Sequence, residues 1–289
     1  MPMEDTPLVA SLATKPEDGL GISAVVSGED DAPIRCIGLR LWLGRNEVLR
    51  GLDLTVHRGE ILSIMGRTGS GKSSLLRCMT GLVRPTGGQA LLFGQDVSSV
   101  NEDQLNRLRR RAGMVFQSAA LFDSLTVFEN VAFFPRRFRK LDVGALSALV
   151  AEKLALVGME GTERLMPAEL SGGMAKRVGI ARALASEPEV ILYDEPEAGL
   201  DPIMRGTVDS VIRGLRDSLG MTSVIVSHHV DHALSISDLA ALLHDGVIHV
   251  VGRPDEFHAS EDPLLRQFIT GSAEGPLTDA PAPGAGEEV

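Results

Sequence analysis

Hydrophobic and polar positions follow two different periods along this chain. Alternation at every second residue predicts two strands, at 35–43 and 48–56, joined by a turn at 44–46. Short apolar runs predict buried strands at 60–65, 89–93, 113–117, 190–194 and 221–227, and a hairpin of 238–244 with 247–251. Apolar residues spaced three and four apart predict helices at 73–79, 102–111, 127–134, 143–157, 175–184 and 263–270. The pattern therefore predicts an α/β protein whose first strands are antiparallel and whose core sheet is mixed.

The same pattern divides the chain into three parts. Residues 1–33 are rich in Gly, Ser, Pro and acidic side chains and are predicted to form a flexible tail. Residues 34–270 are predicted to form one domain, with a helical insertion at about 118–168 between two α/β halves. Residues 271–289 are small, acidic and rich in Pro and Gly, which predicts a disordered C-terminal tail.

Composition narrows the possible classes of function. The chain has 289 residues, 44% of them hydrophobic, which is enough for a substantial core. A formal net charge of -11 argues against binding nucleic acid, or anionic lipid, by charge alone. Cys36 and Cys78 have no metal spacing and are typical of a reduced, cytosolic chain. No signal peptide or spanning apolar stretch is evident, so any membrane work is expected to go through another polypeptide.

A glycine-rich loop separates the strand predicted at 60–65 from the helix predicted at 73–79. It reads Gly66, Arg67, Thr68, Gly69, Ser70, Gly71, Lys72, Ser73, which is the spacing of a nucleotide phosphate-binding loop. Glycines let the backbone turn closely around an anion, and the helix that follows points unpaired N–H groups at it. Lys72 can reach the β- and γ-phosphates, and the Ser73 hydroxyl can ligate Mg²⁺. A chance glycine-rich turn is the alternative, and the flanking strand and helix disfavour it.

Polar side chains also follow three other predicted strands. Asp194 and Glu195 end an apolar run, and ligands bind at the carboxyl ends of strands in open α/β sheets. Asp194 can hold Mg²⁺ through water, and Glu195 can polarise an attacking water. Gln117 could ligate Mg²⁺ or orient water, and His228 could donate to a γ-phosphate oxygen. Each of these last two could instead be an ordinary residue at a strand end.

A second helix start has the composition of a phosphate site. Ser171, Gly172 and Gly173 precede the helix at 175–184, either as a phosphate-binding device or as a simple helix cap. A single chain does not need two such devices, but a head-to-tail dimer would use both, because each subunit could close the nucleotide of the other. Asp201 is predicted to be a helix cap or a contact across that dimer. Trp42, the only tryptophan, either stacks on an adenine ring or packs within its strand.

With these motifs in order, the chain from about residue 34 to about 277 resembles the ATP-binding-cassette (ABC) ATPase subunits of membrane transporters. The matching motifs are Walker A at 66–73, the Q-loop Gln117, the signature at 170–174, Walker B with the catalytic Glu at 191–195, the D-loop Asp201 and the switch His228. The resemblance implies a P-loop NTPase fold with a RecA-like core, an antiparallel β subdomain and an α-helical subdomain. It also implies ATP and Mg²⁺ as ligands and a head-to-tail homodimer.

The resemblance implies a role for each motif residue. The implied catalytic residues are Glu195, His228, Lys72 and Gln117. The implied ATP contacts are Trp42, Gly66, Arg67, Thr68, Gly69, Ser70, Gly71, Lys72, Ser73, Ser74, Ser171, Gly172, Gly173 and Asp201. The implied Mg²⁺ ligands are Ser73, Gln117 and Asp194. Trp42 departs from the family, which more often has Tyr there.

A narrower resemblance covers residues 116–130, 166–174 and 266–276, which look like the ATPase of the Mla (maintenance of lipid asymmetry) phospholipid transporter and its MCE-associated relatives. Met174, in place of Gln, is typical of that branch. It implies three partners, namely an integral-membrane permease, an MCE-domain lipid-binding protein and a small STAS-domain protein, and no nucleic acid. The implied location is the cytoplasmic face of the inner membrane, with attachment through the permease. His229 and Glu197 depart from the family pattern, but neither departure removes a catalytic group.

Three alternative functions remain open at this point. The same ATPase could serve another importer, for example of amino acids. A soluble cassette protein of DNA repair or translation is disfavoured by the single cassette and the acidic charge. An inactive scaffold is disfavoured because every catalytic position is filled.

Overall fold

The structure, a computed structural model, describes residues 31–279. Its strands are β1 (Ile34–Leu43), β2 (Asn46–Val56), β3 (Ile61–Met65), β4 (Gly87–Leu92), β5 (Gln95–Asp96), β6 (Ala112–Val115), β7 (Val190–Asp194), β8 (Thr222–Ser227), β9 (Leu239–His244) and β10 (Val247–Gly252). Its helices are α1 (Lys72–Met79), α2 (Glu102–Arg109), α3 (Val127–Phe138), α4 (Val143–Leu156), α5 (Gly172–Leu184), α6 (Pro202–Leu219), α7 (Val230–Ile236), α8 (Pro254–Ala259), α9 (Pro263–Thr270) and α10 (Pro276–Asp279). Within this range, no helix is long and apolar enough to cross a membrane.

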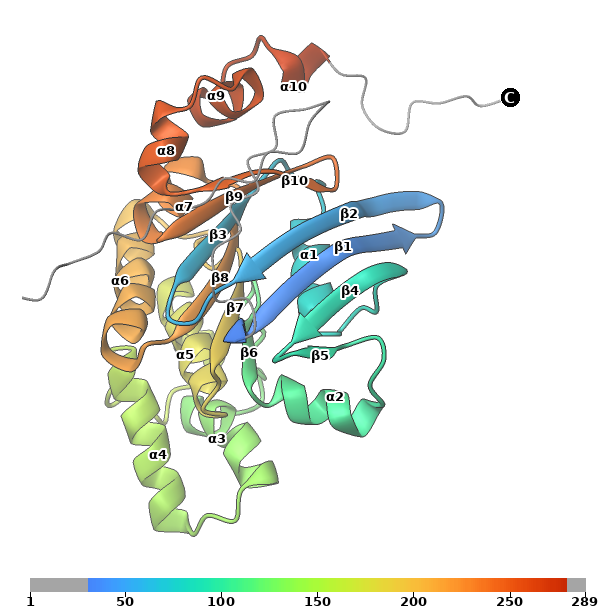
Figure 1. Ribbon diagram of the computed structural model, residues 1–289. Helices are drawn as coiled ribbons and strands as arrows, with labels where there is room; N and C mark the ends of the chain where they lie inside the picture. Colours follow the sequence, from blue (N-terminus) through green and yellow to red (C-terminus); the bar gives the residue numbers. More distant parts are fainter. Residues whose placement is uncertain (1–30, 280–289) are drawn as a thin grey trace, which may run out of the picture.

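Two sheets organise the described residues. The central sheet has the order β10-β9-β3-β8-β7-β6, in which β9, β3, β8, β7 and β6 run parallel and β10 is antiparallel. The second sheet, β2-β1-β4-β5, is antiparallel and lies to one side, with α3 and α4 at one end of the molecule and α8 to α10 at the other (Figure 1). This arrangement confirms the predicted α/β fold with an antiparallel β unit and a helical unit.

The central sheet separates two hydrophobic cores. Leu62 and Ile64 of β3 face a core shared with the antiparallel sheet and α1, whereas Ile61 belongs to the core on the opposite face. The second core also contains Val131 of α3 and Val178 of α5. Every residue of β3, β7 and β8 is buried, which explains why these strands are mostly apolar, since both faces of a parallel sheet are covered.

Four parallel strands direct their following loops to a single edge of the central sheet. Because β3, β8, β7 and β6 all run in one direction, their carboxyl ends lie at the same edge. The residues that follow them are Gly66, His228, Glu195 and Phe116, respectively. The fold thus brings together the loops in which the sequence placed its candidate chemistry.

The structure differs from the sequence prediction in several places. The helix expected to end at Phe134 continues through the buried Pro135 to Phe138, and α7 and α8 were not predicted. The strand expected to reach residue 117 ends at Val115. The tail expected to be disordered from Gly271 is folded up to Asp279, where α10 forms.

The C-terminal helix is held by contacts that composition does not reveal. The Leu277 side chain is buried, its N–H donates to Gln267 Oε1 at 2.6 Å, and its carbonyl accepts a 2.8 Å bond from Arg67 Nη1. The rest of the expected tail, 280–289, lies outside the described residues, as do residues 1–30 of the expected N-terminal tail.

Candidate functional site

The loop from Gly66 to Gly71 connects β3 to α1, and the Ser70 N–H donates to the Arg67 carbonyl at 3.1 Å within it. Gly69 and Gly71 have φ of 85° and 105°, a left-handed backbone that glycine adopts without strain. A side chain at Gly66 would place its Cβ 2.3 Å from the Leu243 carbonyl oxygen and 2.7 Å from Ser70 Oγ. Only glycine therefore fits at Gly66. The buried Ser70 hydroxyl has no hydrogen-bond partner among the described residues, so it is free to meet a ligand oxygen.

Lys72 folds back over this loop. Its Nζ donates to the carbonyl oxygens of Gly66 at 2.8 Å and Arg67 at 2.9 Å. Burial lowers the pKa of Lys72, and the nearby carboxylates of Glu195, Asp194 and Glu197 oppose that shift. A phosphate entering the loop would offer this ammonium a charged acceptor in place of two neutral carbonyls, and charge-assisted hydrogen bonds are the stronger kind.

Ser73 and Asp194 form the candidate magnesium site. The Ser73 hydroxyl donates to Asp194 Oδ1 at 2.8 Å, which joins the first turn of α1 to the end of β7. Hydroxyl and carboxylate oxygens suit Mg²⁺, which usually keeps several waters and substrate phosphates as its other ligands. Within residues 31–279, no group of three His, Cys, Asp or Glu side chains is placed to hold a metal ion.

Glu195 and His228 lie side by side at the ends of β7 and β8. Glu195 Oε1 is 3.2 Å from His228 Nδ1, and the His228 ring lies 4.1 Å from that of His229, measured between centroids. Glu195 has φ of 48°, and its N–H donates to the Val226 carbonyl at 3.0 Å. A left-handed backbone is strained for a residue with a Cβ and is found mainly where function requires a particular side-chain direction.

A buried polar cluster lies behind this pair and was not identified from the sequence. Ser227 Oγ donates to Glu197 Oε1, and His232 Nε2 is 2.6 Å from Asp209 Oδ1. His232 Nδ1 lies 3.9 Å from Glu197 Oε1, which connects the two bonds into one group. Nothing in the local sequence of His232 indicates that α6 supplies Asp209 as its partner.

Gln117 lies at the same edge of the sheet, two residues beyond the end of β6. Gln117 is exposed, and its backbone carbonyl accepts a hydrogen bond from Lys176 Nζ. Lys176 of α5 is only 5% exposed and was not among the predicted site residues. The roles of Gln117 in metal binding and catalysis remain predictions.

The remaining predicted contacts lie at helix starts or on the antiparallel sheet. Ser171 Oγ accepts from the Met174 N–H at 3.3 Å and caps α5, which starts with Gly172 and Gly173, and Asp201 caps α6. Trp42 is 48% exposed and pairs with Glu47 across β1 and β2. Val48, the residue after Glu47, borders Gly71, and the stacking of Trp42 on adenine remains a prediction. Thr68 is exposed, Ser74 is half-buried, and their contacts with ATP remain predictions.

The chain is similar to known proteins over most of its length. The ABC transporter family model matches residues 49–198. The intermembrane phospholipid transport system ATP-binding protein MlaF of Escherichia coli K12 is 43% identical over 234 residues, covering 81% of this chain and 87% of that protein. Protein TRIGALACTOSYLDIACYLGLYCEROL 3, chloroplastic, of Arabidopsis thaliana is 37% identical over 281 aligned positions, covering 91% of this chain and 81% of that protein.

Solved structures show the same fold. CbiO1 of Clostridium perfringens, part of the ABC transporter complex cbiONQ, has a TM-score of 0.74 at 28% identity and covers 80% of this chain and 92% of that one. The ATP-binding cassette MJ0796, a dimer in a post-hydrolysis state with ADP and Pi, has a TM-score of 0.70 at 29% identity. The match covers 76% of this chain and 98% of that one. The chain described here therefore belongs to the ABC transporter family, as an ATP-binding subunit that hydrolyses ATP to power transport.

Proposed function

We propose that this ATPase powers the transport of phospholipids, or of similar lipids, through a separate membrane permease. The observation that carries the proposal is the similarity to a phospholipid transport ATP-binding protein, which extends over 81% of the chain. A second relative, matched over 91% of the chain, has the name of a galactolipid. The cytoplasmic face of an inner membrane is the proposed location, with attachment through the permease.

The proposed chemistry is in-line attack of water on the γ-phosphate of ATP. The loop amides and Lys72 hold the phosphates, and Glu195 Oε1 orients the water, with His228 at 3.2 Å from the same oxygen. Ser73 and Asp194 would hold Mg²⁺, which when bound neutralises charge on the β- and γ-phosphates. Gln117 would complete that site from the neighbouring strand.

Two copies of the chain are proposed to close head to tail around two nucleotides. Ser171 and Gly172 are exposed at the start of α5, where backbone N–H groups are available to an anion, and Asp201 is exposed at the start of α6. A similar cassette is dimeric in its state with ADP and Pi, which supports this arrangement. In the closed pair, the signature residues of one copy would contact the γ-phosphate held by the other.

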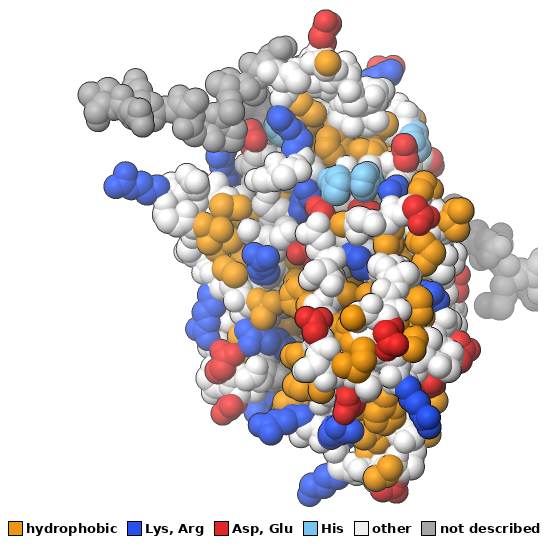
Figure 2. All heavy atoms as spheres, turned by 180° about the vertical axis from the view of Figure 1, so that it is seen from behind, with side chains coloured by type: hydrophobic (Ala, Val, Ile, Leu, Met, Phe, Trp, Pro, Cys, Tyr) orange, Lys and Arg blue, Asp and Glu red, His pale blue; other side chains and the backbone are white. Residues whose placement is uncertain are grey.

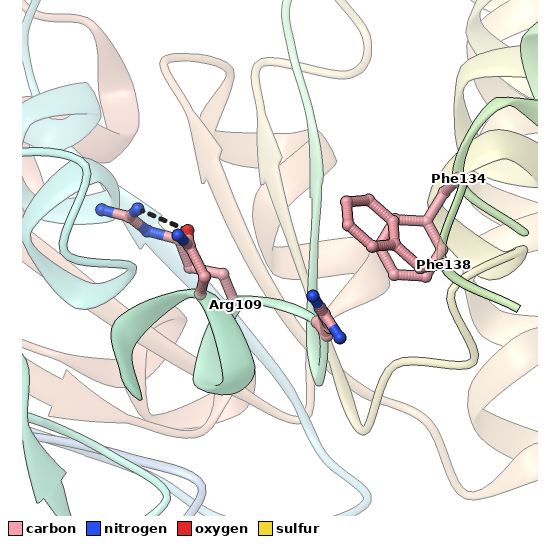
Figure 3. A pocket seen from close by; sticks show the side chains of 5 residues that line it. Arg109, Phe134 and Phe138 are labelled. Atoms are coloured by element: carbon pink, nitrogen blue, oxygen red, sulfur yellow. Dashed lines mark hydrogen bonds between the residues drawn. The ribbon is translucent and has the colours of Figure 1, made fainter. Parts of the chain in front are cut away.

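The permease is proposed to dock beside the helical unit. A cavity of about 300 Å³ lies between α2 and α3, lined by Asn106, Arg109, Arg110, Phe134 and Phe138. The rings of Phe134 and Phe138 point from α3 toward the end of α2 that carries Arg109 (Figure 3). Phe138 is half exposed, and Arg110 lies 4.5 Å from its ring centroid. The face seen from behind the view of Figure 1 carries exposed hydrophobic side chains with Lys and Arg side chains among them (Figure 2). An aromatic cavity with a basic rim suits an amphipathic helix end of a membrane protein.

Affinity purification from a detergent extract tests the proposal. The tagged chain should bring down a permease, an MCE-domain protein, a small STAS-domain protein and bound phospholipid. Recovery with an amino-acid permease and its binding protein, or recovery without lipid, would contradict the proposed cargo. Phe138→Asp should lose the permease, whereas Leu219→Asp, which changes a similarly exposed residue on α6, should keep it.

A further inference from the structure

Helix α5 presents one row of side chains to the loop that contains Gln117. Lys176, Gly179 and Arg182 are spaced three residues apart, so they lie on one face of the helix. A Cβ on Gly179 would lie 3.3 Å from Ala119 Cβ, which shows how closely α5 approaches the loop. A side chain at Gly179 would therefore crowd Ala119 of the loop.

The two cations bind three carbonyl oxygens of that loop. Arg182 donates to the Ala120 oxygen at 2.6 Å and to the Ala119 oxygen at 2.8 Å, and Lys176 Nζ donates to the Gln117 oxygen. Ala119 and Ala120 have φ of 60° and 48°, the left-handed backbone that disfavours a residue with a Cβ. The loop therefore keeps a strained conformation that depends on α5.

Lys176 also reaches the candidate catalytic residue. Its Nζ lies 3.4 Å from the carbonyl oxygen of Glu195, the other strained backbone position of the site. That carbonyl oxygen also accepts the Ala198 N–H at 3.1 Å. Burial lowers the pKa of Lys176, and the carboxylates of Glu197, Glu195 and Asp194 oppose the shift, so these side chains favour the charged ammonium.

We propose that Lys176 is a positioning residue for ATP hydrolysis, which holds the backbones of Glu195 and Gln117 in a fixed relation to α5. It touches neither nucleotide nor water and acts through these two residues. Helix α5 begins at the signature residues, so a displacement of its start would be transmitted by one buried side chain to the carboxylate that orients water. The inference rests on the proposed roles of Glu195 and Gln117 and is independent of the cargo.

Steady-state ATPase kinetics of the full chain test the proposal. Lys176→Met should lower kcat about tenfold, because a charge-assisted hydrogen bond is lost, while KM for ATP changes less than about threefold. Lys176→Arg, which keeps the charge and the donors, should recover most of the lost kcat. The control is Lys153→Met: Lys153 is also buried, on α4, but pairs with Glu152 and not with the site. It should leave kcat unchanged.

Hydrogen exchange by mass spectrometry separates positioning from a loss of folding. In Lys176→Met, exchange should accelerate in peptides covering 117–121 and 195–198 and stay unchanged in α4 and α9. Wild-type kcat in Lys176→Met, or a uniform acceleration of exchange together with failure of Lys176→Arg to restore kcat, would overturn the proposal. Full activity in Lys72→Ala would instead overturn the proposed function, so the two failures are distinguishable.

Discussion

The phosphate loop and the Gln117 loop leave the same edge of one sheet but keep their shapes by different means. Gly69 and Gly71 supply the left-handed positions of the first loop without strain. Ala119 and Ala120 occupy left-handed positions in the second, where each Cβ costs roughly 1–2 kcal/mol. The first loop carries its conformation in its own sequence, whereas the second depends on hydrogen bonds donated by α5.

Another strained residue is also paired with a distant cation. Glu187, between α5 and β7, has φ of 54°, and its carboxylate accepts a hydrogen bond from Arg139, next to the end of α3. A strained residue is again held by a cation that lies far away in sequence. Arg139 thus joins the end of α3 to the segment before β7 at a strained backbone position, which suits a contact that has to change during a working cycle.

The largest effect is expected at the lysine of the first loop. Lys72→Ala should lower kcat/KM for ATP about 10³-fold, because a preorganised cation beside the phosphates contributes to binding and to the transition state. Steady-state ATPase assays check it, with Lys153→Ala as the control for loss of a buried lysine. Turnover within tenfold of wild type in Lys72→Ala would show that the phosphates are held elsewhere.

The next effect distinguishes the two loops directly. Gly66→Ala should weaken ATP binding about a hundredfold, since its methyl group would overlap the Leu243 carbonyl and the loop must shift. Ala120→Gly, the opposite change in the second loop, should leave ATP affinity within about threefold, because it relieves strain and removes no donor. Titration with a fluorescent ATP analogue measures both. Equal losses in the two variants would contradict the distinction.

A smaller effect is expected in stability alone. Arg182→Met should lower the free energy of unfolding by about 2 kcal/mol, since two charge-assisted hydrogen bonds to Ala119 and Ala120 are lost. ATP affinity should stay unchanged, because the phosphate loop does not depend on Arg182. Urea denaturation with and without ATP checks both statements. Unchanged stability would mean that the second loop holds its shape without α5.

The smallest effect concerns pH. The hydrogen bond from Arg139 lowers the pKa of Glu187, so the pair stabilises the folded chain above the usual carboxyl pKa. This contribution is lost as pH falls through the lowered pKa. Both side chains are partly exposed, so the difference between wild type and Glu187→Gln should be about 0.5 kcal/mol at pH 7 and smaller at a pH below the usual carboxyl pKa. Thermal unfolding at the two pH values measures it; a constant difference would contradict the assignment.

Sequence reasoning located the features that are encoded locally. The glycines around Lys72, the carboxylates after β7 and His228 after β8 each follow a buried strand, and parallel strands bring their carboxyl ends together. The strands and most helices were predicted for the same reason, since their periodicity reflects burial on one or both faces.

Features that depend on distant partners were not predicted. Lys176 and Arg182 donate to the Gln117 loop because the fold packs α5 against it. The Leu277 carbonyl accepts a hydrogen bond from Arg67, which is 210 residues away in the sequence. A signal was present, since a lysine on the buried face of an apolar helix requires acceptors. The sequence could not say which carbonyls those would be.

The most direct test of the whole account is a rapid-mixing measurement on Glu195→Gln with Mg²⁺ and ATP. If Glu195 orients the attacking water between the phosphate loop and a second copy of the chain, the variant should bind ATP at one per chain and hydrolyse it about 10³-fold more slowly than wild type. The chains should also remain paired while ATP is present. Hydrolysis at the wild-type rate, or a chain that retains no triphosphate and never pairs, would contradict the account.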